Sequence, residues 1–311
     1  MRVIFFGTPK FAVPSLKTLL ASDQMEVIAV VTQPDKPSGR HQKITFSPVK
    51  EEALRAGIEV LQPHKLKEPG FFETLKRMEP DFIVVVAYGR ILPGEIIHLP
   101  KYGCINLHAS LLPKYRGAAP INHALIHGDK VTGITSMLMD EGLDTGPMLL
   151  TRKIPVSKED TAGTLTEKLA CEAGEILMPT LKGLAEGTLK PVVQHGQTSY
   201  APVLQKADCC IDWSMPAGEI ECKIRGLCPN PGTYCFFKGM RIKIMRAEAL
   251  QGLGKLGFVT TVTKDKLLIG TGLGLLSIVE LQPQGKSAML IRAFLQGHKI
   301  EEGMWFSEGN E

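Results

Sequence analysis

Hydrophobic residues in the first half of the chain follow two alternating patterns. Residues 3–6, 27–31 and 82–87 are apolar at nearly every position, as expected for strands covered on both faces of a parallel sheet. Residues 11–20 and 48–56 repeat their apolar side chains every three or four positions, as in a helix. This succession of strand and helix predicts an α/β domain with a Rossmann-like parallel sheet and right-handed crossovers.

The pattern changes in the second half. Residues 161–184 have a long helical period, and a polar connector follows. Beyond residue 207 the apolar runs become short and are separated by glycine, which favours a small β-barrel. With 311 residues the chain is long enough for two cores. We expect an α/β domain over 1–190, a linker over 191–206 and a barrel over 207–311.

Composition narrows the class of protein. The chain is 44% hydrophobic and 22% charged, as in a folded globular protein, and no apolar run is long enough to span a bilayer. The N-terminus reads as a strand and not as a signal peptide, so we expect a cytoplasmic protein with no membrane partner. The seven cysteines fit neither a disulfide framework nor the ligand spacings of a zinc site, which favours free buried thiols and no metal.

The formal net charge of +4 is mild, but basic residues gather in two segments. One contains Lys36, Arg40 and Lys43, and the other runs from Lys223 to Arg246 without an acidic residue. Such segments favour an anionic partner, although solvated surface lysines produce the same pattern. Basic and apolar residues alternate over residues 241–244, which places Arg241 and Lys243 on the solvent face of a barrel strand.

The candidate chemistry lies in one run and one distant carboxylate. Asn106, His108 and Ser110 alternate, so an extended backbone points them the same way. Asp144 follows in a glycine-rich turn. An amide, an imidazole and a carboxylate that orients it are the parts needed for acyl transfer. The first turn, Gly7 to Lys10, lacks the GxGxxG pattern, which disfavours a dinucleotide cofactor.

Other roles remain open for these residues. His108 could be an ordinary core histidine, and Asp144 could cap its own turn. The Ser110 hydroxyl could cap its loop or contact a ligand. Arg116 could pair with a ligand carboxylate or phosphate, or hold its loop against the sheet.

Short strings in order over essentially the whole chain resemble the motifs of the methionyl-tRNA formyltransferases, a family of folate-dependent formyltransferases. They lie at residues 6–9, 33–37, 87–93, 106–113, 116–121, 139–146, 224–225, 229–232 and 281–286. The pair Asn122-His123 departs from the usual polar residue followed by arginine. The loop from Lys36 to Lys43 is also less basic than is common in the family.

The resemblance implies a Rossmann-like catalytic domain, a linker and a barrel of oligonucleotide-binding type. It implies formyl transfer from 10-formyltetrahydrofolate to the α-amine of initiator methionyl-tRNA in translation initiation, without a metal. The family's folate-contacting loop matches Ser110, Leu111, Leu112 and Pro113, with Arg116 a further candidate contact. The loop that reaches the acceptor stem matches Lys36, Arg40 and Lys43, and the basic barrel adds Arg241 and Lys243 as candidate tRNA contacts.

In this chemistry Asn106 and His108 would donate hydrogen bonds to the oxyanion that forms when the amine attacks. Asp144 would orient His108 or take the amine proton through a water, and the sequence does not choose between these roles. The alternatives are a formyltransferase of an amino sugar nucleotide and a noncatalytic folate- or tRNA-binding protein. A glycinamide ribonucleotide formyltransferase would have no use for the second domain. Nothing in the sequence requires more than a monomer.

Overall fold

The computed structural model describes residues 1–38, 43–68 and 70–309. The chain forms two compact units, each with its own core. Unit 1 comprises residues 1–120, 131–155 and 166–201, and unit 2 comprises residues 121–130, 156–165 and 202–311. Two short segments that precede residue 166 therefore group with the C-terminal part. The domain boundaries drawn from composition, near residues 190 and 207, stay a prediction.

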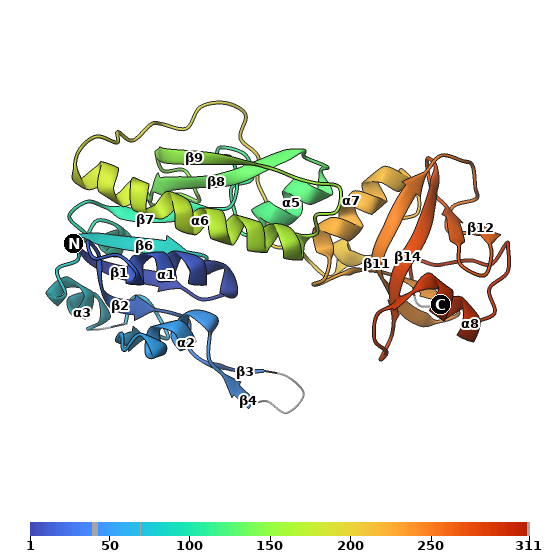
Figure 1. The fold of residues 1–311 in the computed structure, drawn as a ribbon, viewed down its shortest axis with the longest axis horizontal. Coiled ribbons are helices and arrows are strands. Elements are labelled where there is room, and N and C mark those ends of the chain that lie inside the picture. Colours follow the sequence, from blue (N-terminus) through green and yellow to red (C-terminus); the bar gives the residue numbers. More distant parts are fainter. Residues whose placement is uncertain (39–42, 69, 310–311) are drawn as a thin grey trace. The chain divides into compact units, whose positions relative to one another are not determined.

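A seven-stranded sheet forms the core of unit 1, in the order β5-β2-β1-β6-β7-β8-β9 (Figure 1). The first five strands in that order are parallel, which confirms the α/β class. The last two strands, which the sequence did not predict, add antiparallel at this edge. The strands are β1 (Arg2–Gly7), β2 (Glu26–Val31), β5 (Val60–Leu61), β6 (Phe82–Val86), β7 (Cys104–His108), β8 (Val131–Leu138) and β9 (Met148–Pro155).

Both faces of this sheet are buried at its central strands, as the continuous apolar runs predict. Every residue of β6 is buried, and Ile83 and Val85 pack into a cluster with side chains of α3 and α4. The helices α1 and α6 lie together along the sheet (Figure 1). A Cβ on Gly174 of α6 would stand 3.0 Å from Thr18 Oγ1 of α1, so glycine permits this close approach. The helices are η1 (Lys10–Ala12), α1 (Val13–Leu20), α2 (Pro48–Arg55), α3 (Phe71–Arg77), α4 (Gly94–Ile97), α5 (Pro120–Ile126) and α6 (Ala162–Ala185).

A small hairpin that no sequence pattern predicted extends from unit 1. It consists of β3 (Lys36–Ser38) and β4 (Lys43–Thr45), which pair antiparallel. Asp35 comes directly before it and accepts a hydrogen bond from Lys50 Nζ of α2 at 2.5 Å. Gln62 Nε2 donates to the other oxygen of Asp35 at 2.9 Å. These contacts fix the base of the hairpin to α2 and to the residue after β5.

Unit 2 is built around an antiparallel sheet in the order β10-β11-β14-β13-β12, with β15 paired to β14. The segment at residues 304–307 closes the sheet as a barrel. Ser307 and Phe236 of β10 exchange backbone hydrogen bonds, while Met304 O accepts from Val259 N of β12. The elements are η2 (Ala207–Cys209), α7 (Ala217–Leu227), β10 (Thr233–Phe237), β11 (Met240–Leu250), β12 (Val259–Val262), β13 (Leu267–Gly270), β14 (Leu275–Pro283), β15 (Met289–Leu290) and α8 (Ile291–Gly297).

The barrel strands alternate as expected for one buried face. Ile242 and Ile244 of β11 are fully buried, while Arg241 between the turn and this pair is exposed. The turn before β11 is formed by Lys238 and Gly239, whose φ angles of 48° and 73° lie in the left-handed region. A two-residue hairpin turn with both φ angles positive matches the twist of the strands. The predicted barrel strand and its hairpin turn are both confirmed.

Across the described ranges 1–38, 43–68 and 70–309, none of the helices combines the length and hydrophobicity that crossing a bilayer requires.

Candidate active site

Strand β7 carries Asn106 and His108 at the centre of the unit 1 sheet. It pairs parallel with β6 on one side and antiparallel with β8 on the other. Alternation along the strand sends both side chains to the same face, as predicted. Asn106 is half-buried, whereas only 6% of His108 is exposed. A polar side chain so deep in the sheet needs specific hydrogen-bond partners.

Asp144 reaches this pair from the loop between β8 and β9. Its Oδ1 accepts a hydrogen bond from Asn106 Nδ2 at 3.4 Å, and its Oδ2 lies 3.5 Å from His108 Nδ1. The backbone N–H of Gly117 donates to the same Oδ2 at 2.8 Å. The structure therefore brings together the three residues that the sequence singled out, although Asp144 lies far along the chain from the other two.

The backbone of this loop is held in an unusual conformation. Asp144 has a φ of 53°, in the left-handed region that few residues other than glycine adopt. A Cβ on Gly146 would stand 1.8 Å from Leu138 O, so only glycine fits there. Asp140 Oδ1 accepts from Gly142 N and from Thr145 Oγ1, which ties the loop to itself. Asp140 thus supports the loop, and Asp144 is left to face the strand.

The second ring nitrogen of His108 also has a partner. Nε2 lies 2.8 Å from Tyr115 O, and a carbonyl oxygen can only accept. Nε2 therefore carries the proton, and Nδ1 also donates to Asp144 only when the ring is an imidazolium. In this arrangement neither nitrogen of His108 points to open space, whereas the Asn106 amide retains one N–H beyond its contact with Asp144.

Gln194 completes the site, and no sequence pattern pointed to it. Its Nε2 donates to the backbone oxygens of Asp144 and Gly146, both at 2.8 Å. Its Oε1 accepts two hydrogen bonds from the guanidinium of Arg116, at 3.2 and 2.7 Å. Gln194 lies in the segment that composition assigned to the linker. It acts on backbone atoms 48 and 50 residues away, so no local pattern could reveal it.

The predicted folate-contacting loop follows β7 directly. Ser110 is fully buried, and its hydroxyl donates to Lys114 O at 2.6 Å, so here the hydroxyl caps its own loop. Leu112 is buried and its N–H donates to Thr135 Oγ1 at 3.3 Å, while Leu111 and Pro113 are half-buried. A folate contact of this loop stays a prediction.

Arg116 is half-buried and engaged with Gln194, which agrees with its holding a loop in place. Its pairing with a ligand anion stays a prediction.

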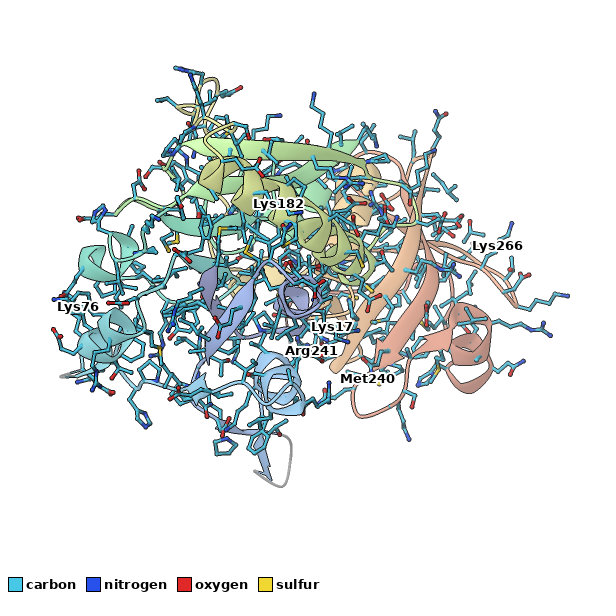
Figure 2. The ribbon with its side chains drawn as sticks, turned by 60° about the vertical axis from the view of Figure 1, so that its left-hand side comes forward. Lys17, Lys76, Lys182, Met240, Arg241 and Lys266 are labelled. Carbon is cyan, nitrogen blue, oxygen red and sulfur yellow. The ribbon has the colours of Figure 1, made fainter. Side chains whose placement is uncertain are left out.

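The candidate tRNA contacts are distributed over both units. Lys36 in β3 is exposed. The guanidinium of Arg241 lies 3.8 Å from the ring centroid of Tyr234. Figure 2 shows Arg241 beside Met240 at the start of β11. Lys243 is half-buried on the same strand. Arg40 lies outside the described residues, as does the side chain of Lys43. Two further cations of the basic segment, Lys223 and Arg225, are engaged inside unit 2, with Cys210 O and with Glu221.

All seven cysteines are free thiols. Burial raises the pKa of the Cys104 and Cys235 thiols, which keeps them protonated and unreactive. Among the residues that the structure describes, no group of three or more His, Cys, Asp or Glu side chains could hold a metal ion.

Comparison with known proteins agrees with this architecture. The family described as formyl transferase matches residues 1–181, and the C-terminal domain of formyl transferases matches residues 203–299. A methionyl-tRNA formyltransferase from Caldanaerobacter subterraneus is 53% identical over 307 residues, covering 97% of this chain and 99% of that protein. One from Thermodesulfovibrio yellowstonii is 48% identical and covers 97% of each chain.

Among solved structures, a sugar 3N-formyltransferase, WlaRD, determined with dTDP and 5-N-formyl-THF, has a TM-score of 0.66 at 20% identity. The match covers 92% of this chain and 99% of that one, and at this identity it shows the shared fold alone. The full-length relatives are far more similar, and both family regions are present in order. The chain belongs to the methionyl-tRNA formyltransferase family.

Proposed function

We propose that the chain transfers a formyl group from 10-formyltetrahydrofolate to the α-amine of methionyl-tRNA, as a cytoplasmic monomer in translation initiation. The observation that carries this proposal is the carboxylate of Asp144, held within 3.5 Å of both Asn106 and His108 at the end of β7. Family membership supplies the substrates, and this arrangement supplies groups suited to acyl transfer.

The reaction needs little beyond polarisation and proton transfer, since a formyl amide is already activated. The amine nitrogen attacks the formyl carbon, which forms a C–N bond and places negative charge on the carbonyl oxygen. Collapse breaks the bond to the donor nitrogen, which takes up a proton as the new amide loses one. Asn106 is the group best placed to donate to the developing oxyanion, because one of its amide hydrogens is not used by Asp144.

The contacts of His108 favour one of the roles considered for Asp144. Tyr115 O fixes the orientation of the ring through Nε2, and Asp144 faces Nδ1. Asp144 thereby orients the ring and stabilises an imidazolium, whose charge would favour the oxyanion nearby. His108 can donate a hydrogen bond to the substrate only if Nδ1 leaves Asp144 or Nε2 leaves Tyr115 O.

The surroundings of the site fit a large, partly apolar donor. Ile91 and Leu143 are exposed by 83% and 54%, although both are large hydrophobic residues. Their loops adjoin, because a Cβ on Gly94 would collide with the side chain of Glu141. Exposed apolar residues beside a polar site are typical of a surface that a ligand covers. The ring system of a folate has this character.

The barrel offers a surface for RNA. Arg241 and Lys243 of β11 lie opposite Phe236 and Tyr234 of β10, so cations and aromatic rings alternate across the two strands. Cations bind phosphates and rings stack on bases, which makes this combination typical of nucleic-acid surfaces. The amino sugar nucleotides formylated by the alternative class of enzyme would not need such a surface.

The test is formyl transfer by the purified protein, with charged initiator methionyl-tRNA and an amino sugar nucleotide offered separately. We expect formyl-methionine on the tRNA and no transfer to the sugar. Transfer to the sugar alone would overturn the substrate but leave the chemistry of the site intact.

A single variant separates an enzyme from a noncatalytic binder. Asn106→Ala should lower kcat about 10²- to 10³-fold with little change in the binding of either substrate, since one oxyanion donor is removed. Glu141→Gln, an exposed change in the same loop as Asp144, serves as the control and should leave kcat unchanged. If Asn106→Ala turned over as fast as the parent protein, the catalytic assignment would be wrong.

A further inference from the structure

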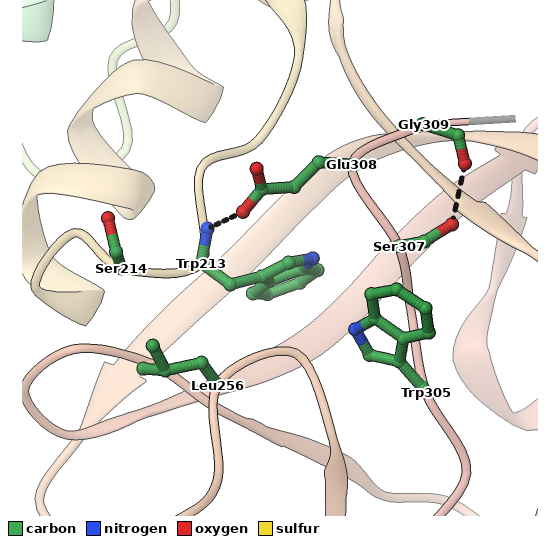
Figure 3. Close-up of a pocket in the computed structure, with 7 residues that line it drawn as sticks. All are labelled: Trp213, Ser214, Leu256, Trp305, Ser307, Glu308 and Gly309. Carbon is green, nitrogen blue, oxygen red and sulfur yellow. Dashed lines mark hydrogen bonds between the residues drawn. The ribbon is translucent and has the colours of Figure 1, made fainter.

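A pocket in unit 2 shares no residue with the candidate active site. It is open to solvent, has a volume of about 460 Å³, and lies within the size range of small-molecule sites. Two indole rings, two serines and a carboxylate line it (Figure 3). The lining residues are Trp213, Ser214, Leu256, Trp305, Ser307, Glu308 and Gly309.

The two indole rings belong to the only tryptophans of the chain. One has a donor without an acceptor among the described residues, and the other has a large apolar surface in water. Trp213 is 1% exposed, and its Nε1–H has no hydrogen-bond partner among the described residues. A buried donor without an acceptor is costly. In Figure 3 this nitrogen lies on the edge of the ring that faces Trp305. Trp305 is 43% exposed, a large apolar surface to leave in water.

Trp305 packs against a neighbouring aromatic ring. Its ring stacks on Phe258 with centroids 6.1 Å apart and an interplanar angle of 16°. The ammonium of Lys255 lies 3.9 Å from the centroid of Phe258. A ring fixed in this way loses little conformational freedom when a second aromatic group stacks on it, so binding there costs less entropy.

Apart from the indole N–H of Trp213, the polar side chains of the pocket are available as acceptors. Glu308 Oε1 accepts from the backbone N–H of Trp213 at 3.1 Å, and no described residue donates to its Oε2. The hydroxyls of Ser214 and Ser307 donate to Asp212 and to Gly309 O, so their oxygens remain able to accept a hydrogen bond. None of the described lining residues is a cation, so the pocket is not suited to a phosphate.

We propose that this pocket binds an unstacked guanine base. Stacking on Trp305 suits any base, but the carboxylate of Glu308 selects one with adjacent N–H donors. Guanine presents N1–H and the N2 amino group side by side, and its O6 and N7 are acceptors for an indole N–H such as that of Trp213. A free guanine nucleotide and an unpaired guanine of an RNA present the same edge. The proposal does not depend on formyl transfer.

Intrinsic fluorescence tests it directly, because both tryptophans of the chain line the pocket. We expect saturable quenching by guanosine and by GMP with similar affinity, since the described lining residues include no cation to bind the phosphate. Inosine monophosphate lacks the N2 amino group and should bind about tenfold more weakly, and AMP and CMP at least as weakly. Absence of saturable quenching, or equal quenching by all the nucleotides, would overturn the proposal.

Two variants examine the contacts by equilibrium dialysis with labelled GMP, which does not depend on fluorescence. Trp305→Ala and Glu308→Gln should each weaken binding about tenfold or more, whereas Trp305→Phe should retain most of it. Glu301→Gln, an exposed acid outside the pocket, is the control. Circular dichroism establishes that each variant is folded. Unchanged binding in folded Glu308→Gln would rule out the base-specific contact.

Two oligonucleotides distinguish a guanine of unpaired RNA from a free guanine nucleotide. The oligonucleotides UUGUU and UUUUU differ in a single base. Tighter binding of UUGUU than of GMP would assign the pocket to unpaired RNA, and equal or weaker binding would assign it to the free nucleotide. Equal binding of the two oligonucleotides would exclude unpaired RNA as the source of the base.

Discussion

At the scale of single residues, the position of Asp144 depends on groups that contact only its backbone. Gln194 donates to Asp144 O and to Gly146 O, and without it these carbonyls lose their partner in a loop that already carries a left-handed residue. We expect Gln194→Ala to lower the free energy of unfolding by about 1–3 kcal/mol, the usual cost of unmet buried polar groups. The change should also lower kcat about 10- to 100-fold, because the carboxylate shifts.

Gln197→Ala is the matched control, since Gln197 is exposed in the same segment. Urea unfolding and steady-state kinetics measure the two effects separately. A positioning role predicts a fall in kcat with the KM of the tRNA nearly constant. A fall in stability with unchanged kcat would reduce Gln194 to a structural residue.

The sequence predicted one part of the site and missed another for a physical reason. Asn106 and His108 were predicted from their alternation along a strand, and Asp144 from its place in a glycine-rich turn. Tyr115 and Gly117 contribute only backbone atoms, a carbonyl and an N–H, which any residue type supplies. Such contacts leave no signature in the order of side chains.

At the scale of elements, an ion pair between Asp35 and Lys50 fixes the β3–β4 hairpin to α2, and its contribution to stability depends on pH. The hydrogen bond from Lys50, helped by a second from Gln62, holds the pKa of Asp35 below its usual value of 3.8, although partial burial opposes this. A carboxyl group whose pKa is lower in the folded protein stabilises it above the unfolded pKa. That stabilisation disappears as the pH falls through the folded value.

We therefore expect Asp35→Asn to lower the free energy of unfolding by the same amount from about pH 5 to about pH 8. The difference between parent and variant should then shrink below about pH 4. Urea unfolding over this range measures it. A difference that grew on acidification would contradict the assigned sign.

We expect two cations of strand β11 to contact the phosphates of tRNA. Replacing Arg241 and Lys243 together by alanine should weaken tRNA binding and reduce the slope of log K against log salt by about one for each phosphate that is no longer neutralised. The double change Lys264→Ala and Lys266→Ala alters the net charge equally on another exposed part of the barrel. Figure 2 shows the position of Lys266. If both pairs changed the slope equally, β11 would have no special part in binding.

Elements with a continuous apolar run or a long helical period were predicted well. The expected strand at 82–87 is β6 (Phe82–Val86), and the expected helix at 161–184 is α6 (Ala162–Ala185). The antiparallel edge of the sheet was missed, because β9 alternates irregularly and is mostly exposed between Thr151 and Lys153. The β3–β4 hairpin has three residues in each strand, too few to show a period.

At the scale of the whole molecule, the order of the chain does not coincide with its division into packed units. Residues 121–130, which include most of α5, group with the C-terminal unit. A hydrogen bond from Asn122 contributes to this grouping. Its Nδ2 donates to Gly226 O of α7 at 2.7 Å, so the pair Asn122-His123, which departs from the family pattern, has one member that joins α5 to α7.

Gly226 tests how closely these helices must approach. A Cβ on Gly226 would stand 2.6 Å from Ile126 Cγ1 and 3.0 Å from the backbone oxygen of Asn122, a contact that the backbone cannot easily relieve. We expect Gly226→Ala to lower the free energy of unfolding by about 1–3 kcal/mol. Gly218→Ala is the matched control on the same helix, because no atom lies within 4 Å of its Cβ position. It should leave stability unchanged or raise it slightly, since alanine favours a helix. Urea unfolding of both variants gives the comparison, and an equal effect at the two positions would show that α5 does not rest on α7.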